Sequence, residues 1–192
     1  MTYRFRFFLF IFVIALLLAP YISCGGNDAG KDKVAVENAN SKYPPAPEAI
    51  RNAEIELIDG TKFKLADKKG TVVLVNLWAT WCGPCRFEMP ELVKMQEKYK
   101  DKGFEIIGLD VDPEPVEEIQ PFAKKMGLTY QLGWAERELV IEFFNISGTE
   151  GIPQSFLLNR KGELTGVFFG VNEGVIRKLK ETVAKVVEEK QD

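Results

Sequence analysis

The sequence predicts an α/β domain in which helices cover both faces of a mixed central sheet. A buried β-rich run at Val72–Leu77 and another at Phe104–Leu109 flank an amphipathic helical segment, and this order is typical of a parallel β-α-β unit. Turn residues at Asp59-Gly60 and at Asn159–Gly162 each separate two strand-like runs, which predicts a β-hairpin at either end of the domain. About 145 residues belong to this part of the chain, enough for one domain with a sizeable core.

Hydrophobic spacing places the individual elements in chain order. Strands alternate or are continuously apolar, whereas helices carry apolar residues every three or four positions. The predicted strands are 53–58, 61–65, 72–77, 104–109, 130–132, 155–158 and 164–169. The predicted helices are 83–100, 116–126, 136–144 and 173–189. Pro90 lies inside the first of these helices and predicts a kink, because proline removes a backbone hydrogen bond.

The N-terminal residues have the pattern of an export signal. Arg4 and Arg6 precede an apolar run from Phe7 to Ala19, which is shorter than the run of about 20 residues that a membrane-spanning helix needs. Cys24, which follows the small Ser23, resembles the lipidated cysteine of a bacterial lipobox. An ordinary signal peptide and an uncleaved short anchor are the alternatives to the lipoprotein signal. In each of the three cases the domain is exported.

Three segments are therefore expected along the chain. Residues 1–23 form a signal peptide of the lipoprotein type, residues 24–49 the lipidated cysteine and a flexible tether, and residues 50–192 the globular domain. The tether is predicted because its Gly, Asn, Lys, Ala and Pro residues show neither helical nor strand spacing. The net charge of −3 and the lack of a basic cluster in the sequence argue against nucleic-acid binding.

The sequence Cys82-Gly83-Pro84-Cys85 is the segment best suited to chemistry. Cys82 is expected at the start of a helix, where the helix dipole and unpaired backbone N–H groups lower the pKa of a thiol. Cys85 follows one turn later on the same side, within reach of Cys82 for an exchangeable disulfide. Gly83 permits a tight turn, and Pro84 favours the first helical turn.

Other interpretations of this cysteine pair are weaker than redox chemistry. A zinc site needs two further ligands, but the sequence has no His and its only other cysteine is Cys24. Covalent haem attachment needs His directly after the second cysteine, where Arg86 stands. A purely structural disulfide across so short a loop gains little from chain entropy. No metal or cofactor is therefore expected.

The string NLWATWCGPCRFEMPEL resembles the thioredoxin superfamily, in particular its membrane-tethered TlpA/ResA-like thiol–disulfide oxidoreductases. The resemblance extends from about Ala53 to the C-terminus. It implies the thioredoxin fold with an N-terminal β-hairpin and a central α-β insertion. It also implies disulfide exchange, with Cys82 as the more exposed nucleophile and Cys85 as the buried resolving thiol.

The resemblance assigns roles to further residues around the cysteines. Trp81 offers an apolar docking surface, and Ile152-Pro153 matches the loop whose cis proline pairs with a substrate strand. Gln154 departs from the small hydroxyl residue usual in the family, which points to a different substrate preference. Glu88 resembles the cleft glutamate of ResA-like proteins and is expected to move protons, because Asn76 occupies the place of the buried acid of thioredoxin. Packing or solvated surface roles are the alternatives for Trp81 and Glu88.

These observations predict an extracytoplasmic, membrane-anchored reductant of disulfides in exported proteins. Apocytochrome c as a substrate and a DsbD- or CcdA-type membrane reductant as an electron donor are implied by the resemblance alone. A peroxiredoxin-like thiol peroxidase is the second hypothesis, although Trp78 stands where the peroxidase pattern has proline. A non-catalytic, membrane-tethered binding domain is the third.

Overall fold

The computed structural model describes residues 44–189. Its strands are β1 Glu54–Leu57, β2 Lys62–Lys64, β3 Val72–Trp78, β4 Phe104–Asp110, β5 Gln131–Trp134, β6 Gln154–Leu158 and β7 Leu164–Phe169. Its α-helices are α1 Glu48–Asn52, α2 Gly83–Tyr99, α3 Val116–Met126, α4 Arg137–Ser147 and α5 Glu173–Glu188. Short 3-10 turns follow β2 (Leu65–Lys68) and α2 (Lys100–Lys102).

The strands form one seven-stranded mixed sheet in the order β2-β1-β5-β4-β3-β6-β7. The predicted parallel pairing of β3 with β4 and the two predicted antiparallel hairpins, β1–β2 and β6–β7, are confirmed. The inserted strand β5 lies parallel to β4 and antiparallel to β1, so it joins the N-terminal hairpin to the central strands. The helix α2 continues through Pro90 to Tyr99.

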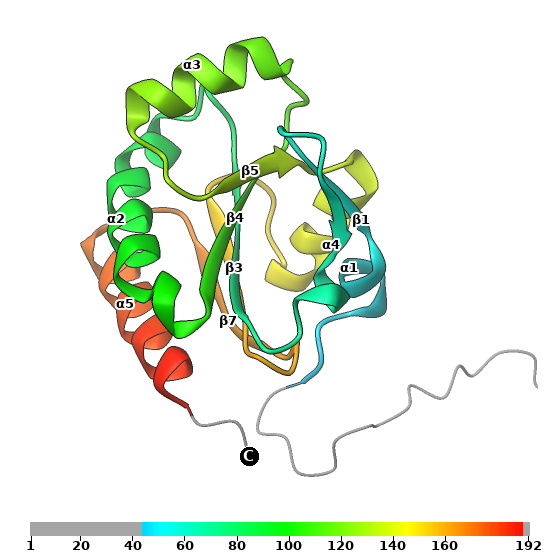
Figure 1. Cartoon of the computed structure of the whole chain (residues 1–192), viewed down its shortest axis with the longest axis vertical. Coiled ribbons are helices and arrows are strands. Elements are labelled where there is room, and N and C mark those ends of the chain that lie inside the picture. Colours follow the sequence, from blue (N-terminus) through cyan, green and yellow to red (C-terminus); the bar gives the residue numbers. More distant parts are fainter. Residues whose placement is uncertain (1–43, 190–192) are drawn as a thin grey trace, which may run out of the picture. The chain divides into compact units, whose positions relative to one another are not determined.

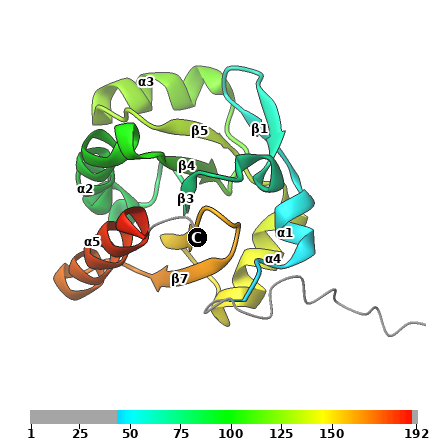
Figure 2. The same cartoon turned by 60° about the horizontal axis from the view of Figure 1, so that its bottom comes forward.

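Strand β3 is the centre of the domain, because all of its side chains are buried. Its residues alternate between two apolar clusters on opposite faces of the sheet: Leu74 and Trp78 belong to one, Val75 and Leu77 to the other. Helices α2, α3 and α5 cover the first face, and α1 and α4 cover the second (Figures 1 and 2). Asn76 lies between Val75 and Leu77 in the sequence and therefore faces the opposite side, toward α2. It is a polar residue in an otherwise apolar strand.

The domain begins earlier than the predicted boundary at residue 50. Pro45 forms an isolated β-bridge with Glu163, the Ala46 N–H donates to the Gly162 carbonyl, and Ala46 is buried. Helix α1 begins at Glu48 and buries Ile50. The prediction of a flexible tether is therefore wrong from Pro44 onward. Prolines indicated a linker, but their apolar neighbours instead pack against the second face of the sheet.

The predicted signal peptide and the lipidated Cys24 lie outside the described residues. Within residues 44–189, no helix is long and apolar enough to cross a membrane.

Candidate active site

Cys82 and Cys85 form a disulfide at the N-terminus of α2. Cys82 is the N-cap residue of this helix, and its Sγ accepts a hydrogen bond from the Cys85 backbone N–H at 3.1 Å. The peptide dipoles of α2 point their positive end at the same sulfur. Both effects favour a thiolate on Cys82 once the disulfide is reduced.

Cys82 is the more exposed of the two cysteines, as predicted, but both are buried in this disulfide form. Only 3% of Cys82 is exposed, and Cys85 is fully buried. Burial arises because both sulfurs face the apolar cluster beneath α2, which also contains Met89 and Trp78. Trp81, by contrast, is 60% exposed, as a docking surface requires.

The loop after β4 holds the active-site loop in place. Asp112 accepts a hydrogen bond from Trp81 Nε1 at 3.1 Å, and Glu114 accepts one from Thr80 Oγ1 at 2.6 Å. Asp110 in turn accepts a hydrogen bond from the Asp112 N–H. Burial raises the pKa of the Asp110 carboxyl to about 7. Sequence reasoning did not find this contact, although the acidic residues directly after a strand were a visible signal.

The peptide bond between Ile152 and Pro153 is cis, as predicted. Leu77 near the end of β3 pairs with Gln154, so Pro153 lies beyond the same end of the sheet from which the chain leads to Cys82. Gln154 is buried, and its Nε2 donates to the carbonyls of Gly151 and Thr149. Its side chain thus braces its own loop. If Gln154 affects substrate preference, as the resemblance implies, it has to do so through the shape of this loop.

Glu88 and Asn76 form a buried pair behind the disulfide. Glu88 is 4% exposed, and its Oε1 accepts a hydrogen bond from Asn76 Nδ2 at 2.6 Å. The same amide group donates to Ser155 Oγ at 3.0 Å, which connects α2, β3 and β6. Burial raises the pKa of Glu88 to about 7, although the bond from Asn76 opposes this shift. A carboxyl group that titrates near neutral pH is suited to accepting and returning a proton.

The raised pKa of Glu88 predicts that the unfolding free energy depends on pH, and that Glu88→Gln removes this contribution. The folded state binds the Glu88 proton more tightly than the unfolded state, so the stabilisation is complete below pH 4.5 and is lost as pH rises through 7. We expect wild type to lose about 3 kcal/mol more unfolding free energy than Glu88→Gln between pH 4.5 and pH 8. Urea unfolding at both pH values measures the difference. Glu117→Gln, at an exposed position on α3, serves as the control; equal losses in Glu88→Gln and wild type would contradict the assignment.

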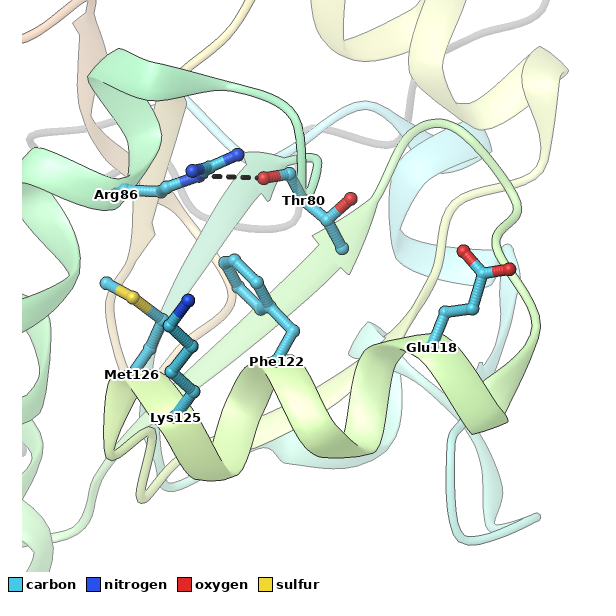
Figure 3. A pocket seen from close by; sticks show the side chains of 6 residues that line it. All are labelled: Thr80, Arg86, Glu118, Phe122, Lys125 and Met126. Atoms are coloured by element: carbon cyan, nitrogen blue, oxygen red, sulfur yellow. Dashed lines mark hydrogen bonds between the residues drawn. The ribbon is translucent and has the colours of Figure 1, made fainter.

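Two surface hollows adjoin the first turn of α2. One, of about 350 Å³, lies between the active-site loop and α3 and is lined by Thr80, Arg86, Glu118, Phe122, Lys125 and Met126 (Figure 3). Arg86 lies over the Phe122 ring and donates from Nε to the Thr80 carbonyl. The other, of about 750 Å³, lies between α2 and α5 and contains Phe87, which is 64% exposed. Arg86 borders both hollows.

The described residues contain no group of three potential ligands that could hold a metal ion.

A disulfide at the start of a helix, next to the central strand of this sheet, defines a thiol–disulfide oxidoreductase with the thioredoxin fold. Comparison with known families agrees with this class. Residues 46–167 match the AhpC/TSA family, and the chain belongs to that family.

Individual relatives are thiol–disulfide proteins. The chain is 33% identical over 127 residues to the thiol-disulfide oxidoreductase ResA of Bacillus thuringiensis (strain Al Hakam), which covers 64% of this chain and 71% of that protein. It is 31% identical over 132 residues to ResA of Halalkalibacterium halodurans, which covers 69% and 73%. A solved thiol:disulfide interchange protein of the thioredoxin family from Chlorobium tepidum TLS matches with a TM-score of 0.64 and 30% identity, covering 78% of this chain and 99% of that one.

Proposed function

We propose that this oxidoreductase works as a reductant of disulfides in exported proteins, held at a membrane on the extracytoplasmic side. The observation that carries the exchange chemistry is the hydrogen bond from the Cys85 N–H to Cys82 Sγ at the N-terminus of α2, because it stabilises Cys82 as the attacking thiolate. The direction of transfer is proposed from the residues between the cysteines. The Gly83-Pro84 pair between the cysteines resembles that of reducing thioredoxins. Similarity to ResA proteins and the N-terminal lipobox-like sequence support the location.

The reaction proceeds through two thiol–disulfide exchange steps. The Cys82 thiolate attacks a substrate disulfide, forming a mixed disulfide and releasing one substrate thiolate, which takes up a proton. Cys85 then loses its proton and attacks Cys82 Sγ. This second step re-forms the Cys82–Cys85 disulfide and releases the other substrate thiolate, so two electrons pass from the protein to the substrate.

Glu88 is the proposed acceptor of the Cys85 proton. It lies one helical turn beyond Cys85 on α2 and on the same buried side. In the transfer the Cys85 S–H bond breaks and a Glu88 O–H bond forms, and the proton later returns to a thiolate. Trp81, Ile152 and Pro153 are proposed to hold the substrate segment that carries the disulfide.

The partners follow the family resemblance. Apocytochrome c is the proposed substrate, and a membrane protein of the DsbD or CcdA type is the proposed source of electrons that regenerates the dithiol. Both proposed partners would exchange disulfides with Cys82 through their own cysteine sulfurs.

The reduction potential of the Cys82–Cys85 couple tests the direction of transfer. We expect a value near that of thioredoxin, about −270 mV, when the full-length chain is equilibrated in defined thiol buffers. A value nearer −120 mV, that of a strong oxidant, would make the protein a disulfide donor instead. Consumption of hydrogen peroxide without an added partner would favour the peroxidase alternative, and absence of a reversible couple would favour a binding domain.

A further inference from the structure

Three buried polar atoms near the redox site lack a hydrogen-bond partner within residues 44–189. They are Asn76 Oδ1, Trp78 Nε1 and the Tyr130 hydroxyl. Leaving such an atom unpaired costs about 1–3 kcal/mol, and native proteins keep few of them. All three lie on the α2 side of the sheet, where Trp78 and Tyr130 belong to the cluster that contains both cysteines.

Gly108 creates the space for this group. It pairs with Asn76 across β3 and β4. A Cβ on Gly108 would stand 3.1 Å from Trp78 Nε1 and 3.1 Å from Tyr130 Cε2, closer than nearly all real contacts of that kind. The glycine therefore lets the Tyr130 ring lie directly over β4, next to the strand position that carries Asn76.

Glu88 is the ionisable group that Asn76 connects to this arrangement. Asn76 donates to its Oε1, as described above. The negative charge of Glu88 also acts on Tyr130, where it raises the pKa of the phenol in addition to the larger effect of burial. The phenol consequently keeps its proton throughout the neutral pH range. It is a permanent hydrogen-bond donor, only 7% exposed, in the electrostatic range of a carboxyl group that changes its charge.

We propose that Tyr130 is a positioning residue for disulfide exchange, whose hydroxyl supplies Glu88 with a hydrogen bond when Glu88 is ionised and thereby sets the pH at which Glu88 accepts the Cys85 proton. This inference rests on the proposed role of Glu88. Before the transfer, the Glu88 carboxylate has two donors, Asn76 and Tyr130. After it, Glu88 holds the proton and needs only the bond from Asn76, which is the arrangement seen with the disulfide formed.

Tyr130→Phe tests the proposal, because it removes the hydroxyl and keeps the ring. Carbon-13 NMR of the Glu88 carboxyl in the full-length, reduced protein should show its titration midpoint raised by about one pH unit, since a hydrogen bond to the ionised form favours that form. Tyr99→Phe is the matched control. Tyr99 is also buried in this cluster but lies at the far end of α2 and packs against Phe104. It should leave the Glu88 midpoint unchanged.

The pH profile of the exchange rate separates the positioning role from the proposed function. Tyr130→Phe should move the profile upward by the same amount as the Glu88 midpoint, and should cause no shift in a Glu88→Gln background. A shift in the Glu88 midpoint without a matching shift in the rate profile would overturn the inference. If Glu88→Gln alone leaves the wild-type profile intact, the proton-transfer role of Glu88 fails instead.

Gly108→Ala provides a second variant that keeps the hydroxyl but displaces it. The new Cβ would press on the Tyr130 ring and on Trp78 Nε1. We expect the Glu88 midpoint to rise here too, by less than in Tyr130→Phe. An unchanged midpoint in both variants would overturn the proposal, because a tyrosine with a purely structural role has no reason to act on the Glu88 titration.

Discussion

Cys85→Ser is expected to convert the protein into a trap for its own substrates. Cys82 remains at the helix N-cap and can still attack a disulfide, but no thiol is left to resolve the mixed disulfide. The variant should therefore accumulate as a covalent complex with disulfide-containing proteins, and its turnover should fall on the order of 10³-fold. Non-reducing gels followed by mass spectrometry of the captured peptides would measure both the trapping and the substrate cysteine.

Two matched variants give this experiment its controls. Cys82→Ser should lose turnover to the same extent and form no complex, because the nucleophile itself is gone. Cys24→Ser should retain full exchange with soluble disulfides, since only Cys82 and Cys85 form the redox pair in the described residues. A complex that forms equally well with Cys82→Ser would mean that the assignment of nucleophile and resolving thiol is reversed.

Asn76→Asp is expected to destabilise the domain strongly above neutral pH. It replaces the amide that donates to Glu88 at 2.6 Å by a second buried carboxyl. Two carboxylates at this distance cannot both ionise without a large cost, so the pair should share one proton and titrate in two coupled steps. At pH 8 we expect a loss of about 3–5 kcal/mol of unfolding free energy, the size typical of an uncompensated buried charge.

The sign of this effect follows from the raised pKa values of the pair. A carboxyl that holds its proton more tightly in the folded state stabilises the protein at low pH, and this contribution disappears as pH rises. The loss should accordingly be much smaller at pH 5 than at pH 8 in urea unfolding. Asn172→Asp is the control, because Asn172 caps α5 through its Oδ1 and aspartate caps a helix equally well. Equal losses at the two pH values would show that Asn76 acts through packing alone.

Much of the fold could be predicted because its elements have strong local signals. The continuous apolar run of β3 and the helical spacing of α3 and α5 placed these elements within a residue or two of their observed ends. Helix α1 could not be predicted in the same way. It is one short turn behind three prolines, and it is stabilised by tertiary burial of Ile50, which no local pattern reports.

The candidate site could be predicted only in part, for a similar reason. Cys82 and Cys85 are separated by only two residues, and their chemistry depends on the helix that starts between them. The bond from Asn76 to Glu88 joins two elements, so the sequence suggested each residue but not their contact. Tyr130 gave no signal as a site residue, because its place beside the site depends on Gly108 of β4, which has no side chain.

The place where the chain joins the domain has a consequence for how the protein meets its partners. Pro45 is bridged to Glu163 in the β6–β7 turn, at the end of the sheet where β3 begins, whereas the disulfide follows the end where β3 stops. A force transmitted through the residues that precede Pro45 would therefore act at the end of the sheet opposite the disulfide. An attachment on that side would leave the exposed Trp81 side chain at the free end of the domain, where the proposed redox partners could reach it in turn.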